Sequence, residues 1–314
     1  MGNEFIFERR NFLGIPPEAA ELEKARFAVL PVPFEKTTTY RRGTMYGPIS
    51  LIEASQQLEL HDEETGTSTW KAGVHTMAAV PILDRPSDYF TSIANAVEPV
   101  LRMGKVVFTI GGEGSITEGP LSGVQRVHHK VTVLHFDAHA DLRPTYSGSV
   151  YNHACAAQRM LRYADKVVQV GIRSIADDEV RELHNKKLKT FFMHQNRDVA
   201  ALIPKVVEEL SDPVYISIDL TGFDPSVVPG VGRPEPGGFG WYDALDLFRA
   251  VINNKKVVAV DVVELTPLKE TVASELTAAK LIYRLMGYLQ RKEQATASRS
   301  PAGKSTRRIK VDKR

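Results

Sequence analysis

Short apolar runs alternate with longer segments of mixed polarity along most of the chain. The runs are rich in β-branched residues and do not alternate with polar ones, as in VTVLHF at 131–136, so they predict strands buried on both faces. Strands are expected at 27–32, 105–110, 131–136, 167–170, 189–192, 214–219 and 257–260. Helices are expected at about 89–103, 115–127, 153–163, 177–184, 198–210, 242–253 and 272–289. Strands separated by helices predict an α/β domain whose mostly parallel sheet is covered on both faces.

This pattern continues without a linker to about residue 290, so residues 1–290 are predicted to form one domain. Residues 291–314 carry nine Lys or Arg and two Asp or Glu, a net charge of +7, whereas residues 1–290 carry 31 basic and 36 acidic residues, a net charge of −5. The terminal segment is rich in Ser, Thr, Ala and Gly, which predicts a disordered basic tail. Such a tail can contact nucleic acid or an anionic surface, but a solvated terminus is the simpler interpretation.

The composition is that of a globular protein, with 43% hydrophobic and 25% charged residues. No apolar run approaches the roughly 18 residues that a membrane span needs. The single cysteine, Cys155, excludes an internal disulfide. The first residues, MGNEFIFE, lack the basic and then apolar pattern of a secretory signal. We therefore expect a cytoplasmic protein without a membrane segment.

Glycine-rich or acidic segments follow four of the predicted strands: GGEGS (111–115), DAHAD (137–141), DLTGFDP (219–225) and DVVE (261–264). Ligands bind at the carboxyl ends of parallel strands, so these segments are candidates to share one site. Asp137, His139 and Asp141 alternate along the chain and point the same way, and Asp219 adds a third carboxylate. This donor set suits Mn²⁺ or another hard divalent ion. The alternative is a polar turn in which an Asp caps the next helix.

The same segments, in this order, resemble the ureohydrolase family of agmatinases and arginases. The matching stretches are GGEGSIT (111–117), DAHADLR (137–143), YNHAC (151–155), SIDLTGFDPSVVPGVGRPEPGG (217–238) and DVVEL (261–265). The segment PVPFEKTTTYRRGTMYGP (31–48) is similar to the agmatinase branch. The resemblance implies a three-layer α/β/α fold, a homo-oligomer, and hydrolysis of a small cationic guanidino substrate, agmatine or aminopropylagmatine, to a polyamine and urea. It also implies two Mn²⁺ ions that activate a water molecule.

The resemblance implies roles for six side chains. The metal ligands that it implies are Asp137, His139, Asp141 and Asp219, of which the first and the last bridge the two ions. His153 matches the proton shuttle of the family. Glu264 matches the carboxylate that receives the substrate guanidinium, for which it is a natural bidentate partner.

Three positions depart from the family pattern. Gly114 stands where the family has a histidine ligand and Thr221 where it has an aspartate ligand, so each ion keeps three protein ligands instead of four. Arg233 replaces a threonine, and its guanidinium could pair with Glu264 and fill the substrate slot, reach the carboxylate cluster, or point to solvent. These departures leave open whether two, one or no Mn²⁺ ions bind.

The sequence is therefore compatible with three interpretations of the function. The first is a working agmatinase-like hydrolase. The second is a catalytically weak or inactive member of the family with a structural or regulatory role, for instance as the partner of an active paralogue. The third is an altered chemistry at a site with a single metal ion.

Overall fold

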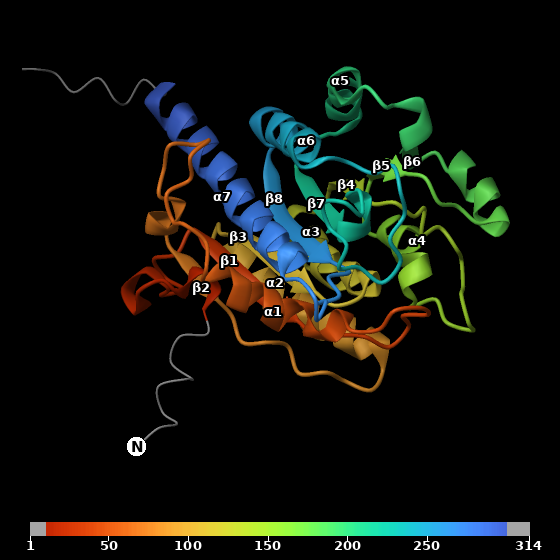
Figure 1. Ribbon diagram of the computed structural model, residues 1–314, viewed down its shortest axis with the longest axis horizontal. Helices are drawn as coiled ribbons and strands as arrows, with labels where there is room; N and C mark the ends of the chain where they lie inside the picture. Colours follow the sequence, from red (N-terminus) through yellow and green to blue (C-terminus); the bar gives the residue numbers. More distant parts are fainter. Residues whose placement is uncertain (1–10, 300–314) are drawn as a thin grey trace, which may run out of the picture.

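Eight strands form one sheet in the order β2-β1-β3-β8-β7-β4-β5-β6, and every pairing in it is parallel (Figure 1). The computed structural model describes residues 11–299. The strands are β1 (Phe27–Val32), β2 (Val74–Thr76), β3 (Val106–Gly111), β4 (Thr132–Phe136), β5 (Lys166–Ile172), β6 (Leu188–Phe192), β7 (Val214–Asp219) and β8 (Val257–Val263). All the predicted strands are present, and β2 is an additional short edge strand that the apolar pattern did not indicate.

Seven α-helices connect and cover the strands within the described residues. They are α1 (Gly47–Ser55), α2 (Pro86–Arg102), α3 (Glu118–His128), α4 (Ala156–Met160), α5 (Val199–Glu209), α6 (Trp241–Asn254) and α7 (Ala273–Arg299). The structure adds α1 to the predicted set. It also changes two predicted helices, because Asp177–His184 is a 3-10 helix and the segment from His153 divides into a 3-10 turn and α4.

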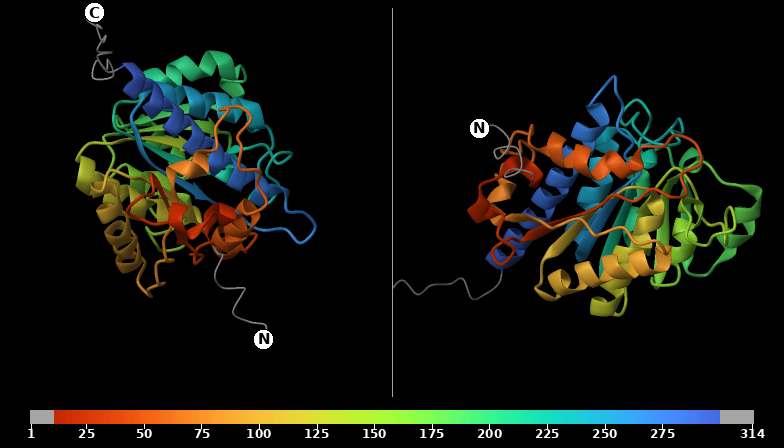
Figure 2. Two further views of the ribbon diagram at one scale, coloured as in Figure 1. Left: turned by 90° about the vertical axis from the view of Figure 1, so that its left-hand side faces the viewer. Right: turned by 90° about the horizontal axis from the view of Figure 1, so that it is seen from below.

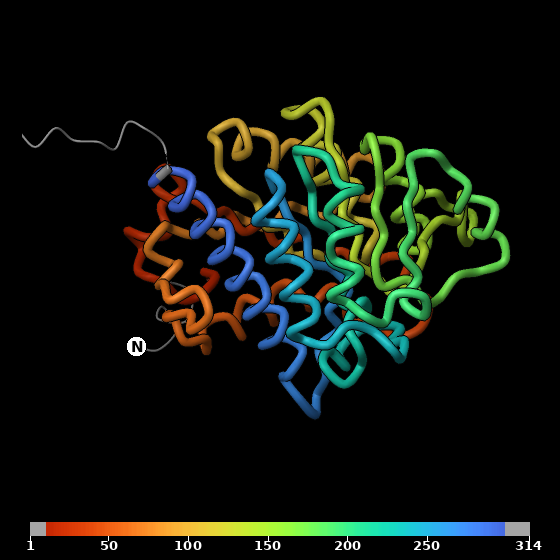
Figure 3. The backbone as a smooth tube through the Cα atoms, turned by 90° about the horizontal axis from the view of Figure 1, so that it is seen from above, coloured from red at the N-terminus to blue at the C-terminus, as the bar shows by residue number. Residues whose placement is uncertain are grey.

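The sheet is buried on both faces because consecutive strand residues point into two separate cores. In β1, Phe27 and Val29 pack into the core under α1, α5, α6 and α7, whereas Ala28 and Leu30 pack into the core under α2, α3 and α4. Figure 2 shows the sheet between these two layers, and Figure 3 shows α5, α6 and α7 side by side over one face. The predicted three-layer α/β/α architecture is confirmed.

The last helix corrects one expectation about the C-terminal segment. Helix α7 continues to Arg299, so the disorder that the composition predicts from residue 291 is wrong for residues 291–299. The rest of the predicted tail, residues 300–314, lies outside the described residues. No helix between residues 11 and 299 is both long and apolar enough to cross a membrane.

The strand order brings the predicted acidic and glycine-rich segments next to one another. Strands β3, β8, β7 and β4 are consecutive neighbours in the centre of the sheet. They are the same four strands whose ends carry the glycine-rich and acidic segments. Because the strands are parallel, those four segments meet at one edge of the sheet.

Candidate active site

A cavity of about 410 Å³, part of it open to solvent, lies at the carboxyl ends of these central strands. Its walls include seven of the residues that the sequence singles out: His139, Asp141, His153, Asp219, Thr221, Arg233 and Glu264. Asp137 lies directly beneath, with no exposed surface. The structure thus brings the predicted site residues together, and we call this space the main cavity.

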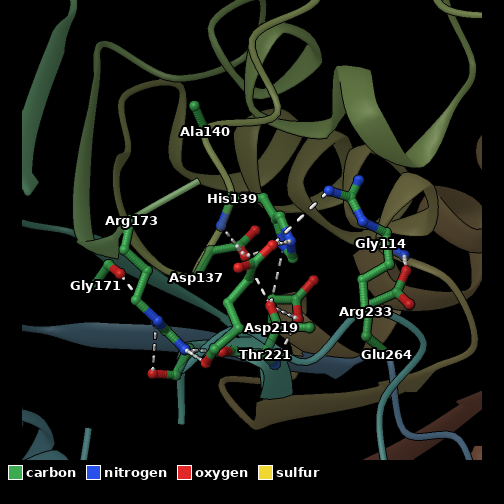
Figure 4. Close-up of polar contacts among 12 residues, drawn as sticks. Gly114, Asp137, His139, Ala140, Gly171, Arg173, Asp219, Thr221, Arg233 and Glu264 are labelled. Atoms are coloured by element: carbon green, nitrogen blue, oxygen red, sulfur yellow. Dashed lines mark hydrogen bonds and ion pairs between the residues drawn. The ribbon is translucent and has the colours of Figure 1, made fainter. Parts of the chain in front are cut away.

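Thr221 links two carboxylates at the floor of the main cavity (Figure 4). Its Oγ1 lies 2.9 Å from Asp137 Oδ1 and 2.6 Å from Asp219 Oδ1. The Thr221 N–H also donates to Asp219 Oδ1 at 2.8 Å. A hydroxyl carries a single proton, so Thr221 donates to only one of the two carboxylates at a time. Thr221 therefore holds the two carboxylates in place but does not substitute for a third.

Among the described residues, His139 Nε2 is buried without a hydrogen-bond partner. Asp137 Oδ2 makes no well-directed hydrogen bond either, but it lies 3.1 Å from His135 Nε2. His139 Nδ1 is 3.5 Å from Asp137 Oδ1, and its Nε2 is 3.6 Å from Glu235 Oε1. Buried polar atoms are normally satisfied, so His139 Nε2 indicates a place where a ligand or ion would find a partner.

Burial and mutual repulsion shift the pKa values of the acids. Burial, followed by the charge of Asp137, raises the pKa of Asp219 to about 7. The same two causes raise the pKa of Asp141 well above its ordinary value, and burial with the charge of Asp219 does so for Glu264. Burial opposes ionisation of Asp137 as well, but the neighbouring imidazoles outweigh it and hold its pKa below the usual range. The cluster is therefore short of positive charge.

Two of the acids sit on strained backbone. Asp141 has a φ of 52° and Glu264 a φ of 69°, in the left-handed region that residues other than glycine seldom occupy. Such strain costs about 1–3 kcal/mol per residue and persists only where the surroundings impose it. The strand-end loops therefore hold these carboxylates in fixed positions, as is typical of a functional site.

Gly114 lies against the carboxylate that matches the guanidinium receptor. Its N–H donates to Glu264 Oε1 at 2.6 Å, and no described residue donates a hydrogen bond to Glu264 Oε2. A Cβ at position 114 would lie 3.6 Å from Glu264 Oε1 and 3.7 Å from Asp219 Oδ2, which is ordinary contact. Position 114 thus faces the acid cluster, as expected for the position of a ligand, but glycine supplies no side-chain donor there.

His153 is oriented by a chain of hydrogen bonds through Thr37. Thr37 Oγ1 donates to Glu113 Oε1 at 2.8 Å, so its lone pairs are left to accept from the His153 N–H and from His153 Nδ1, both at 3.0 Å. This arrangement assigns the ring proton to Nδ1 and leaves Nε2 as an acceptor. Burial lowers the pKa of His153, although Glu113 opposes the shift. The imidazole is therefore neutral near pH 7.

Arg233 adopts neither of the two inhibitory positions considered from the sequence. Its Nη2 lies 4.0 Å from Glu235 Oε1, and its side chain is 46% exposed. Figure 4 shows the guanidinium extending past Glu264 towards His139, and no ion pair joins Arg233 to Glu264 within the described part of the chain. Arg233 lines the mouth of the main cavity, half open to solvent.

Sequence reasoning missed residues whose roles appear only in three dimensions. The guanidinium of Arg173 donates hydrogen bonds to six backbone carbonyls, including those of Thr221 and Glu235 (Figure 4). It fastens the loop of Thr221 to the loop of Glu235. Thr37 and Glu235 were also missed, although the position of Glu235 two residues after Arg233 in a site loop was a signal.

The four candidate metal ligands, Asp137, His139, Asp141 and Asp219, lie together at the main cavity. Within residues 11–299, no group of three or more His, Cys, Asp or Glu side chains is arranged to hold a metal ion. The donor chemistry nevertheless suits a hard divalent cation, because three carboxylates and an imidazole adjoin and the buried His139 Nε2 has no hydrogen-bond partner among the described residues. Gly114 adds no side-chain donor to this set, and the Thr221 hydroxyl already contacts Asp137 and Asp219.

The comparisons with known proteins agree with this architecture. Residues 25–287 match the model of the arginase family. The chain is 38% identical over 274 residues to an N(1)-aminopropylagmatine ureohydrolase of Synechocystis, covering 84% of this chain and 89% of that protein. It is 30% identical to an agmatinase of Pyrococcus horikoshii, covering 85% and 93%. The agmatine ureohydrolase structure of Thermoplasma volcanium superposes with a TM-score of 0.83 at 28% identity, covering 93% and 98%. The resemblance drawn from the strand-end motifs is confirmed: this chain belongs to the arginase family.

Proposed function

We propose that this protein is an agmatinase-like ureohydrolase that converts agmatine or aminopropylagmatine to a polyamine and urea. The observation that carries the proposal is the position of Glu264 in the wall of the main cavity. One of its oxygens is fixed by the Gly114 N–H, and the other receives no hydrogen bond from a described residue. A carboxylate so placed pairs with a guanidinium, and the named activities of the Synechocystis and Pyrococcus relatives support this substrate class.

A divalent cation, Mn²⁺ by resemblance, belongs to the proposal. Asp137, His139, Asp141 and Asp219 would hold it, and we expect one ion rather than two. When bound, such an ion acts as a Lewis acid and lowers the pKa of water towards neutrality.

His153 is placed to move protons in the proposed reaction. Water adds to the guanidinium carbon, and the bond from that carbon to the alkyl nitrogen breaks, which gives urea and an amine. His153 Nε2 is free to take a proton from the adding water and to return it to the leaving nitrogen. The Glu113–Thr37 chain keeps the ring in the required tautomer throughout.

A second candidate function is binding of a guanidino compound without hydrolysis. It is favoured by one specific observation, the loss of ligands at Gly114 and Thr221. In that case Glu264 would still receive the guanidinium, and the protein would serve a structural or regulatory role beside an active paralogue.

Urea release from agmatine and aminopropylagmatine in the presence of excess Mn²⁺ distinguishes the two functions. The comparison is the restored variant Gly114→His, Thr221→Asp, Arg233→Thr, and Glu264→Gln is the negative control. Hydrolysis by the native chain that Glu264→Gln abolishes supports the proposal. Urea release by the restored variant alone, with the native chain still binding agmatine, would establish the binding function instead.

The remaining expectations from the sequence stay predictions. They are a homo-oligomer, a cytoplasmic location and an active paralogue as partner. Size-exclusion chromatography with light scattering measures the first directly.

A further inference from the structure

A second cavity of about 480 Å³, part of it open to solvent, adjoins the main cavity, and we call it the side cavity. Three residues, His139, Asp141 and Arg233, line both spaces. The rest of the wall includes Arg143 and Ser174. The two spaces therefore meet at these three residues, with Arg233 between Glu264 in the main cavity and Arg143 in the side cavity.

Two guanidinium groups line the side cavity with most of their donors unused. Arg143 has one ion-pair contact, from Nε to Asp178 Oδ1 at 3.5 Å, and its guanidinium carbon lies 4.3 Å from the centre of the Tyr146 ring. Among residues 11–299, the ion-pair contact of Arg233 is the one with Glu235 at 4.0 Å. Neither guanidinium donates a hydrogen bond to any residue in the part of the chain that the structure describes, although each carries five N–H groups.

The acids around the side cavity do not satisfy these donors. Glu179 is buried, and its two oxygens accept from the N–H groups of Leu142 and Ala176, both at 2.7 Å. Asp178 is 56% exposed and faces solvent as well as Arg143. Asp141 is shared with the main cavity, where the proposed cation would engage it. Within the described residues, each of the two guanidinium groups at the side cavity thus has a single long contact with an acid and several N–H donors without a hydrogen bond.

We propose that the side cavity binds a carboxylate between Arg143 and Arg233. A guanidinium offers paired N–H donors that match the two oxygens of a carboxylate, and a planar fork on each side of the anion doubles this match. The carboxylate has two sources: a separate small carboxylate, or the far end of an ω-guanidino acid whose guanidinium meets Glu264. The second source rests on the proposed function and extends its substrates beyond guanidino-amines.

The test is isothermal titration calorimetry of the full chain with butyrate, 4-guanidinobutyrate and agmatine at constant ionic strength. We expect butyrate to bind, and Arg143→Gln and Arg233→Gln each to weaken its binding roughly tenfold. Arg143→Lys keeps the charge and the stem over Tyr146 and should lose less. Arg102→Gln, an exposed arginine on α2, is the matched control and should bind as the native chain does.

The three probes separate the sources of the carboxylate. If 4-guanidinobutyrate binds more tightly than butyrate, and Glu264→Gln removes only that difference, the carboxylate is the far end of a guanidino acid. Equal affinities that ignore Glu264→Gln show a separate anion site. Binding of both carboxylates that is unchanged in Arg143→Gln and Arg233→Gln, or no binding to the native chain, overturns the proposal. Urea release from agmatine in the same preparations reports independently on the proposed hydrolase.

Discussion

Replacing Thr221 by valine tests whether its hydroxyl stabilises the acid cluster. The substitution removes the Oγ1 contacts to Asp137 and Asp219, at 2.9 and 2.6 Å, and keeps the branched shape of the side chain. Each carboxylate oxygen retains one donor, because the His139 N–H still reaches Asp137 at 2.8 Å and the N–H of residue 221 still reaches Asp219 at 2.8 Å. The change therefore isolates one hydroxyl proton between two buried acids.

The expected loss follows from that count. One buried hydrogen bond to a charged group contributes about 1.5–3 kcal/mol. Unfolding entropy is roughly 2.1 cal/mol/K per residue near the melting temperature, so a chain of 314 residues loses about 1.5 °C for each kcal/mol. The melting temperature of Thr221→Val should therefore fall by about 2–5 °C.

Thermal unfolding in a chelator, followed by circular dichroism, measures this fall. Thr221→Ser is the matched control, since it keeps the hydroxyl and loses only the methyl group. If Thr221→Val and Thr221→Ser melt within about 1 °C of each other, the hydroxyl does not stabilise the cluster and the reasoning is refuted.

Three further predictions concern other parts of the site. Gly114→His has room for its side chain, since a Cβ there makes only ordinary contacts at 3.6 and 3.7 Å. It should raise the manganese content, counted after removal of free metal, from one ion per chain towards two. An unchanged content would contradict the assignment of position 114 as a ligand position. Arg173→Lys replaces a guanidinium with five N–H donors, which hydrogen-bonds to six carbonyls, by an ammonium with three donors. It should lower the free energy of unfolding, measured in urea, by about 2–4 kcal/mol. A loss smaller than about 1 kcal/mol would mean that these hydrogen bonds do not stabilise the two loops. Burial lowers the pKa of His153, so its protonation should reduce urea release only below pH about 6.5. In His153→Asn, this fall in rate on the acidic side of the pH profile should be absent. A fall that begins above pH about 6.5 would exclude His153 as the titrating group.

The fold could be predicted from sequence because most of its strands are short, mainly apolar runs. A run such as 131–136 has no polar alternation, and both its faces are buried in β4. The short edge strand β2 carries only three residues, one of them His75, so it gave no comparable signal. Helix α7 extends beyond residue 290, where the domain was predicted to end. Composition did not reveal this extension, because the exposed end of a helix can be as polar as a disordered tail.

The site could be predicted only where neighbours in sequence share a role. Asp137, His139 and Asp141 were found because one strand end carries them all. The links from Thr37 to His153 and from Arg173 to Thr221 join residues 116 and 48 positions apart, and only the folded sheet brings them together. Their partners are backbone groups and hydroxyls, which no spacing rule identifies.

The two lost metal ligands and the two arginines of the side cavity point to one consequence for recognition. One oxygen of Glu264 already accepts a hydrogen bond from the Gly114 N–H, so Glu264 offers a guanidinium fewer acceptor sites than a free carboxylate does. The cation that would position the reacting water has lost donors at Gly114 and Thr221 as well. A ligand held only at its guanidinium end would therefore be held weakly. Binding at the far end, where Arg143 and Arg233 offer unused donors, would restore the lost affinity, so the selectivity of this protein among guanidino compounds should depend on the far end of the ligand more than on the guanidinium.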